Sequence, residues 1–486
     1  MTARSTLLRR LFAVRSVESI IGDLETHPRL NRVLSAGALT AIGLGCTIGT
    51  GIFILTGTVA ANHSGPALTL ALLIAAIGSA FAGICYAELA AMIPVSGSAY
   101  TYTYATLGEA IAWIVGWNLS LEYMISASAV AVGWSEYVVN ILAGWGVQLP
   151  HALVSAPLDK GPTGGLISTG AIVNLPAVLI ILILGWFCYI GIRESANANT
   201  VMVLIKVAVI VLFIGAGAAY VDTSNWQPYI PQNTGTFGHF GWSGVFQGAG
   251  IIFFSYVGFD AASTAAREAR NPQRDLPLGI LATLLISAVL YIGMGAVMTG
   301  MVPYEKLGQA APVAVALDAH PELMWLGLIV KIGAIAGMTS VILMSLLGQP
   351  RIMLSMAEDG LLPPAIQKVH PVHRTPHVAT IWTVVIAAVI AGLFPLNVLG
   401  ELISIGILLA FTAVCLGVLV LRYTKPDMPR PFRVPWAPFT CVLGALICGG
   451  MTYFLPADTW WRLAIWTALG FAAYAGYGYR HSRLRM

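Results

Sequence analysis

The chain has 486 residues, of which 57% are hydrophobic and only 9% are charged, and its mean hydropathy is +0.81. In soluble domains about a quarter of all residues are charged, so this composition excludes a soluble globular protein and indicates an integral membrane protein. The formal net charge is +4, but no basic patch is interleaved with aromatic residues, which argues against a nucleic-acid partner.

Twelve apolar segments are long enough to span a bilayer, whose hydrocarbon core of about 30 Å needs about 20 residues of helix. We therefore predict an all-α membrane protein with 12 transmembrane helices, preceded by a basic N-terminal arm (1–34) and followed by a short tail (479–486). The predicted helices 1 to 12 are 36–60, 66–92, 106–133, 168–190, 198–219, 243–265, 277–301, 323–349, 377–394, 399–421, 434–453 and 459–478.

The distribution of basic residues predicts the orientation. Most of the 25 lysines and arginines lie in the arm, in the loops after helices 4, 6, 8 and 10, and in the tail. The opposite face carries only Lys160, Lys306 and Arg462. By the positive-inside rule both termini are cytoplasmic, and we expect a multi-pass protein of the plasma (inner) membrane without a cleaved signal peptide.

Cysteine and histidine patterns give no reason to expect a metal or another cofactor. Each of the six cysteines stands alone in apolar sequence, so we interpret them as small packing residues. The run HPVHRTPH (His370, His373, His377) superficially resembles metal-ligand spacing, but its two prolines favour an ordinary loop. The cysteines are Cys46, Cys85, Cys188, Cys415, Cys441 and Cys448.

Helices 1 and 6 are rich in residues that weaken a helix. Helix 1 contains GLGCTIGTGIF (43–53) and helix 6 contains GAGIIFFSYVGFDAAS (248–263). Glycine costs up to about 1 kcal/mol inside a helix, and irregular backbone is tolerated at membrane depth only where it is buried in protein or lines a wet cavity. Close packing of small residues, as in Gly45-x-x-x-Gly49, is the alternative for helix 1 alone.

Two interrupted helices at corresponding positions predict a transporter built from inverted repeats, with its substrate at the breaks. The repeats would be helices 1–5 (35–220) and 6–10 (243–422), with helices 11 and 12 (434–478) peripheral. A half-helix that starts near Thr50 offers free N–H groups to a carboxylate. The carbonyls of an unwound 254–258 suit an ammonium, so the two breaks together fit an α-amino acid.

Five motifs resemble the cationic amino acid transporter family of the amino acid–polyamine–organocation superfamily. The similarity covers essentially the whole chain, and the twelve helices resemble its bacterial branch. It implies a leucine-transporter-type 5+5 fold with helices 1 and 6 broken at mid-membrane. The motifs are GLGCTIGTGIF, YAELAAMIPVSGSAYTYTYATLGE (86–109), WNLSLEYMISASAVAVGWSEY (117–137), FFSYVGFDAASTAAREARNPQRDLP (253–277) and RIMLSMAEDGLLP (351–363).

The resemblance also implies a substrate site. The carboxylate would meet the backbone at Thr47, Thr50 and Gly51, and the amino group would meet the carbonyls of Phe254, Ser255 and Val257. The substrate side chain would meet Glu122, Asp260 and Met338.

Three ionisable residues carry the remaining expectations about the site. Glu122 needs a partner at membrane depth, which is either a cationic substrate or neighbouring hydroxyls. Asp260 either faces the substrate or caps the second half of helix 6. The resemblance places the Lys206 ammonium where sodium-coupled relatives of the fold hold an ion, so Lys206 either exchanges the coupling proton or tethers helix 1.

Other polar residues are expected to be structural. Lys331 and Glu401 could pair near the outer ends of helices 8 and 10, and Glu88 would be a gate or packing residue. We expect Tyr102 and Tyr104 to be interfacial aromatics in the loop before helix 3.

These observations predict a secondary active transporter that imports amino acids, with cationic ones (arginine, lysine, ornithine) favoured and broad specificity left open. It would be proton-coupled, sodium-independent and work by alternating access. The alternatives are an exchanger of amino acids or polyamines and a membrane amino-acid sensor. The sequence shows no combination of a nucleophile and a base that would indicate an enzyme, and no continuous series of polar residues that would indicate a channel. The expected partners are the amino acid, the proton and the lipid bilayer, with a small membrane partner left open.

Overall fold

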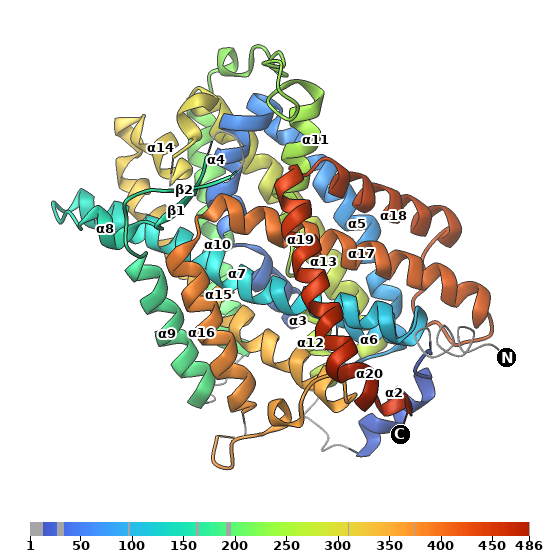
Figure 1. The fold of residues 1–486 in the computed structure, drawn as a ribbon. Coiled ribbons are helices and arrows are strands. Elements are labelled where there is room, and N and C mark those ends of the chain that lie inside the picture. Colours follow the sequence, from blue (N-terminus) through green and yellow to red (C-terminus); the bar gives the residue numbers. More distant parts are fainter. Residues whose placement is uncertain are drawn as a thin grey trace.

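The computed structural model describes residues 13–26, 34–95, 98–161, 165–190, 196–309, 311–373 and 375–485. These residues form a bundle of long helices, with a two-stranded antiparallel hairpin of β1 (Leu158–Lys160) and β2 (Leu166–Ser168) at one end (Figure 1). The prediction of an all-α, multi-span membrane protein is therefore confirmed.

Each predicted transmembrane segment coincides with helix. Helix 1 is α3 (Ala36–Thr47) followed by η1 (Gly51–Leu55), α4 (Thr56–Val59) and η2 (Ala60–Ser64). Helix 6 is α11 (Gly241–Ile252), η6 (Phe253–Tyr256) and α12 (Ala261–Thr264). The others are α5 (Leu68–Met92), α7 (Glu109–Gly144), α9 (Leu175–Ile190), α10 (Ala196–Gly217), α13 (Pro272–Met301), α15 (Met324–Glu358), α16 (His377–Leu393), α17 (Leu396–Thr424), α18 (Ala437–Tyr453) and α19 (Ala457–Ala473).

Shorter helices occupy the ends and the connections. They are α2 (Val17–Thr26) in the arm, α6 (Ser98–Thr106) before α7, α8 (His151–Val154), α14 (Pro312–Asp318) and α20 (Tyr479–His481).

Length and apolarity alone identify fewer spans than twelve. Among the described residues, seven helical stretches are long and apolar enough to cross a membrane, and the bent pair α18 and α19 makes eight if counted as one span. The helices α3, α9 and α16 are apolar but shorter. α3 is short because helix 1 breaks after Thr47, and together these elements account for the twelve predicted segments.

The helix α7 crosses the middle of the bundle and packs against α15, α17, α16 and α9 (Figure 1). On the other side of the breaks, α13 packs against α5 and α3. Glycines permit several of these crossings: a Cβ on Gly83 or Gly185 would meet the side chain of Leu284 or Val384. The predicted inverted repeat stays a prediction.

The loop before helix 3 differs from the prediction. Tyr102 and Tyr104 lie in α6 and are buried, so they are not interfacial loop residues. The Tyr102 ring packs edge-on against Tyr86, at 5.2 Å between centroids, and the Tyr104 hydroxyl donates to Glu109 over 3.0 Å. The connection folds back as a helix because its aromatic side chains find partners inside the protein.

Lys331 forms an ion pair with Asp318, with 3.4 Å between Nζ and Oδ2. The side chain of Glu401, its predicted partner, lies outside the described residues.

Both ends of the described chain lie on one face of the molecule. Arg15 pairs with Asp359 at 2.6 Å, and the amide of Arg483 donates to the carbonyl of the same Asp359 over 3.0 Å. Figure 1 shows the two ends close together. The other basic residues of the arm, Arg4, Arg9, Arg10, Arg29 and Arg32, lie outside the described residues.

Candidate functional site

Helix 1 is interrupted at Ile48 and Gly49. Ile48 has extended backbone angles, and the chain returns to helix at Thr50. A helix end leaves carbonyls without intrahelical partners, and two of these bond to other helices. Lys206 Nζ of α10 donates to the carbonyl of Gly45 over 2.7 Å, and the Tyr291 hydroxyl of α13 donates to that of Thr47 over 3.0 Å.

The glycine-rich stretch of helix 1 (43–53) is longer than the observed break. Gly43 remains helical within α3, where a Cβ would lie 2.9 Å from the Thr283 methyl carbon of α13. Close packing therefore explains Gly43. The backbone break explains Gly49, which has the side chain of Val341 against it.

Helix 6 is interrupted over a slightly longer stretch. After α11 a single 3-10 turn, η6, leads into a non-helical segment, 257–260, before α12 begins. Gly258 has φ +115°, a conformation that residues with a Cβ rarely adopt. The Ser404 hydroxyl of α17 donates to the Ile251 carbonyl over 3.0 Å, so here too another helix satisfies backbone near the break.

The two breaks lie directly against each other. A Cβ on Gly258 would lie 2.8 Å from the carbonyl carbon of Cys46 and 2.9 Å from the amide nitrogen of Thr47. A Cβ on Gly51 would lie 2.6 Å from the Cα of Ser255. Because backbone cannot yield as a flexible side chain can, these contacts require glycine, and they bring together the two predicted halves of the site.

Two hydroxyls at this junction are buried without a partner. Thr50 Oγ1 and Ser255 Oγ accept or donate no hydrogen bond within the described part of the chain, although the residues are only 0% and 1% exposed. An unsatisfied buried polar group costs about 1–3 kcal/mol, so such atoms need an explanation. A bound polar ligand would supply the missing hydrogen bonds.

The two predicted acidic residues lie near one another. Glu122 on α7 is buried, and its carboxyl is close enough to Asp260 for an electrostatic interaction. Among the described residues Glu122 Oε2 has no hydrogen-bond partner. Because oxygens of buried carboxylates are normally paired, Glu122 can accept a cation or a proton.

Asp260 precedes α12 but does not cap it with its side chain. Its Oδ2 accepts from the Ser98 hydroxyl of α6 over 3.2 Å, and Ser98 is hydrogen-bonded in turn to the Tyr86 hydroxyl at 2.5 Å. Ser98 lies in the motif 86–109, but its pairing with Asp260 was not predicted, because only the fold of α6 brings Ser98 to helix 6.

Lys206 is fully buried between three helices. From α10 it donates to Gly45 of α3, and its stem lies against α15, where a Cβ on Gly337 would be 3.3 Å from Lys206 Cε. Lys206 therefore lies beside the end of α3 and against α15, and its part in proton coupling stays a prediction. Met338, the neighbour of Gly337, is also fully buried.

Sequence reasoning missed several contacts of the breaks. A Cβ on Gly133 of α7 would meet Thr50 and Ile54, and the Tyr137 hydroxyl donates to the Phe53 carbonyl over 3.0 Å. Both residues lie in the motif that ends in GWSEY, so that motif was the available signal. Nothing in the sequence around Tyr291 singles it out.

Glu88 has a structural role. Its carboxylate accepts from Arg422 Nη2 over 2.5 Å and from the Val434 amide over 2.6 Å, and it lies 3.3 Å from Arg430 Nε. It therefore ties α5 to the connection between α17 and α18.

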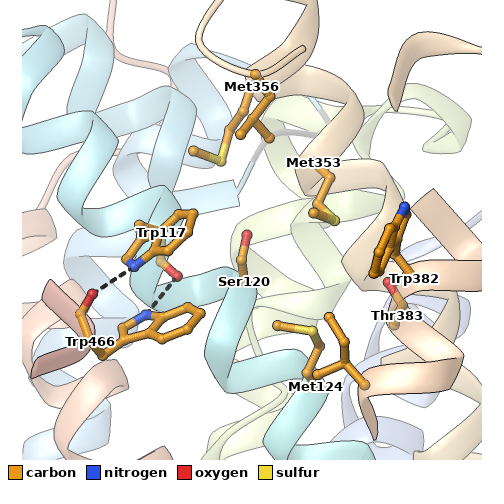
Figure 2. A pocket seen from close by; sticks show the side chains of 10 residues that line it. Trp117, Ser120, Met124, Met353, Met356, Trp382, Thr383 and Trp466 are labelled. Carbon is orange, nitrogen blue, oxygen red and sulfur yellow. Dashed lines mark hydrogen bonds between the residues drawn. The ribbon is translucent and has the colours of Figure 1, made fainter. Parts of the chain in front are cut away.

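An apolar pocket lies apart from the breaks, between α7, α15, α16 and α19. Figure 2 shows Trp117 and Trp466 on one side of it and Trp382 on the other. The indole nitrogen of each of the first two donates to the other's carbonyl, over 2.9 and 3.3 Å. Met124, Met353 and Met356 also line the pocket, and because its lining is almost entirely apolar it suits no zwitterion.

Comparison with known proteins gives a consistent result. The family model described as amino acid permease matches residues 34–474. The chain is 42% identical over 475 residues to the branched-chain amino acid permease BcaP of Bacillus subtilis (strain 168), covering 98% of this chain and 99% of the relative. It is 44% identical over 474 residues to the methylthioribose transporter of the same organism, with the same coverage. It is 40% identical over 400 residues to the vacuolar cationic amino acid transporter 4 of Arabidopsis thaliana, covering 82% of this chain and 64% of the relative.

Proposed function

The chain belongs to the amino acid permease family of the amino acid–polyamine–organocation superfamily, and from that premise we propose that it is a secondary active transporter importing α-amino acids. The observation that carries the proposal is the contact between the two broken helices, with Gly51 against Ser255 and Gly258 against Thr47. Alternating access would move one helix bundle about this junction.

Both ends of an amino acid find partners at the junction. The substrate carboxylate binds at Thr47, the last residue of α3, and at Thr50 and Gly51, where helix 1 resumes and its N–H groups and dipole favour an anion. The ammonium binds the carbonyls of Phe254, Ser255 and Val257. The unpartnered hydroxyls of Thr50 and Ser255 support this placement, since a zwitterion can satisfy both.

We further propose that the substrate side chain is cationic and lies toward Glu122, Asp260 and Met338. The support is the buried, unpartnered Oε2 of Glu122, which a lysine or arginine side chain would pair. Relatives named cationic amino acid transporters agree with it, whereas two others are named branched-chain amino acid permeases. Substrate preference therefore has to be measured with both classes together.

The coupling ion in this proposal is the proton. The Lys206 ammonium already donates to the Gly45 carbonyl beside the break, so a sodium ion at the same place would be repelled. Sodium-independent uptake follows from this arrangement. Lys206 is the proposed proton carrier, and the unpartnered carboxyl of Glu122 is the second candidate.

We place the transporter in the plasma membrane with both termini cytoplasmic, which agrees with the ends of the described chain meeting at Asp359. The amino-acid exchanger stays the second candidate function. Counterflow with and without an imposed pH gradient separates the two: a symporter concentrates substrate in response to the gradient, and an exchanger needs internal substrate.

The experiment that tests the proposal is a thermal-stability panel on the purified protein. A ligand that binds only the folded state raises its apparent stability, by about 2.7 kcal/mol at a concentration of 100 times Kd. The panel contains arginine, lysine, ornithine, leucine, isoleucine, valine, alanine and methylthioribose. Stabilisation by cationic amino acids supports the full proposal. Stabilisation by branched-chain amino acids alone would mean that Glu122 does not pair with a cationic substrate side chain. Stabilisation by methylthioribose alone would overturn amino-acid transport.

A further inference from the structure

Three cysteines from three helices meet inside the bundle, away from the breaks. Cys85 of α5 and Cys441 of α18 are in van der Waals contact, with 3.6 Å between the two Sγ atoms. Cys415 of α17 interacts with Cys85, and its Sγ would lie 2.9 Å from a Cβ on Gly444 of α18. All three side chains are fully buried, and none of the six cysteines of the chain forms a disulfide.

The geometry suits a bridge of one atom better than a direct disulfide. A disulfide requires about 2.05 Å between the sulfurs, so the Sγ atoms of Cys85 and Cys441 would have to approach by well over 1 Å. An atom that bonds both sulfurs leaves them near their present separation. The pair is therefore arranged as a bidentate dithiol.

The thiols are close to the lipid but closed to water. Figure 1 shows α18 at the edge of the bundle, beside α5 and α17. The outer face of α18 exposes Val442 and Leu446, at 42% and 66%, while Cys441 points inward. A ligand must therefore be uncharged and lipophilic, and must pass from the bilayer around a single peripheral helix.

We propose that Cys85 and Cys441 form a binding site for trivalent organoarsenicals and related uncharged electrophiles that take two thiolates. With an arsenoxide, R–As=O, two As–S bonds form and the As=O bond breaks. The oxygen leaves as water with the two thiol protons. No electron is transferred, so the reaction needs no oxidant.

The test uses the purified full-length protein and phenylarsine oxide. Excess monothiol is then added to remove arsenic held by a single sulfur, and the intact mass and, after denaturation, the number of titratable thiols are measured. The wild type should retain one phenylarsine group and lose two of its six titratable thiols. The dithiol 2,3-dimercaptopropanol should restore all six.

Four variants locate the bridge. Cys85→Ala and Cys441→Ala should retain no phenylarsine group after the monothiol wash. Cys415→Ala, inside the cluster, and Cys188→Ala, on α9, should both retain one phenylarsine group as the wild type does and lose two of their five titratable thiols. Full retention by Cys441→Ala would overturn the assignment, because the bridge would then involve another thiol, and a wild type with six titratable thiols would overturn the site itself. The unchanged reaction of Cys415→Ala shows that removing a thiol here leaves the fold competent.

Discussion

Replacing Lys206 by methionine tests the most unusual contact at the breaks. Methionine keeps most of the apolar stem that packs against Gly337 but removes the ammonium that donates to the Gly45 carbonyl over 2.7 Å. A hydrogen bond to a charged group contributes about 1.5–3 kcal/mol. If this bond forms in only one conformation of helix 1, its loss shifts the conformational equilibrium by about 10- to 150-fold.

We expect Lys206→Met to reduce proton-driven uptake in proteoliposomes by about that factor. Amino-acid binding, measured by thermal stabilisation, should survive at least in part because Lys206 contacts the Gly45 carbonyl rather than the proposed substrate contacts. Lys331→Met is the matched control, since Lys331 lies in α15 and pairs with Asp318. Its uptake should remain close to that of the wild type.

Wild-type uptake with an unchanged pH response in Lys206→Met would refute this reasoning and move the proton to Glu122 or Asp260. An equal loss of uptake in Lys331→Met would show that the loss in Lys206→Met reflects impaired folding rather than a role of Lys206 in coupling. Uptake driven by a sodium gradient without a response to pH would reject the role of Lys206 outright.

Three other variants, the first with a control, test the proposed site and the contacts around it. Gly258→Ala should abolish binding or lower the thermal midpoint, because φ +115° costs a residue with a Cβ about 1–2 kcal/mol before the contact with backbone is counted, whereas Gly449→Ala, with nothing within 4 Å, should be neutral in the same melting assay. Glu122→Gln should weaken the binding of lysine by a few kcal/mol in a binding titration and leave the binding of alanine nearly unchanged. Equal losses of affinity for both amino acids would give Glu122 a structural role instead. Glu88→Gln should destabilise the protein by roughly 3 kcal/mol without changing substrate preference, and an unaltered denaturation midpoint would contradict its role as a tether.

The breaks could be predicted because glycine and threonine are so unfavourable in apolar helices that their presence needs a reason. The reason differs between residues: Gly43 permits packing against Thr283, and Gly51 permits contact with Ser255. One sequence cannot separate these two uses of glycine. Both look the same until the partner helix is placed.

The partners of the breaks could not be predicted, because they come from distant parts of the chain. Tyr291 bonds the Thr47 carbonyl from α13, and Ser98 bonds Asp260 from α6. The sequence around a tyrosine or serine in an apolar segment does not indicate which hydrogen-bond acceptor its hydroxyl will find in the fold. The inward turn of Tyr102 and Tyr104 was missed for the same reason, since only tertiary contacts decide whether an aromatic faces lipid or protein.

The central claim is that the two touching breaks hold both ends of an α-amino acid. Thermal stabilisation of the purified protein by lysine and leucine, each compared with its Nα-acetyl derivative and its α-methyl ester, tests it most directly. We expect a free amino acid to stabilise the protein and expect this stabilisation to disappear when either its amino group or its carboxylate is blocked. Equal stabilisation by a free amino acid and either blocked form would contradict it.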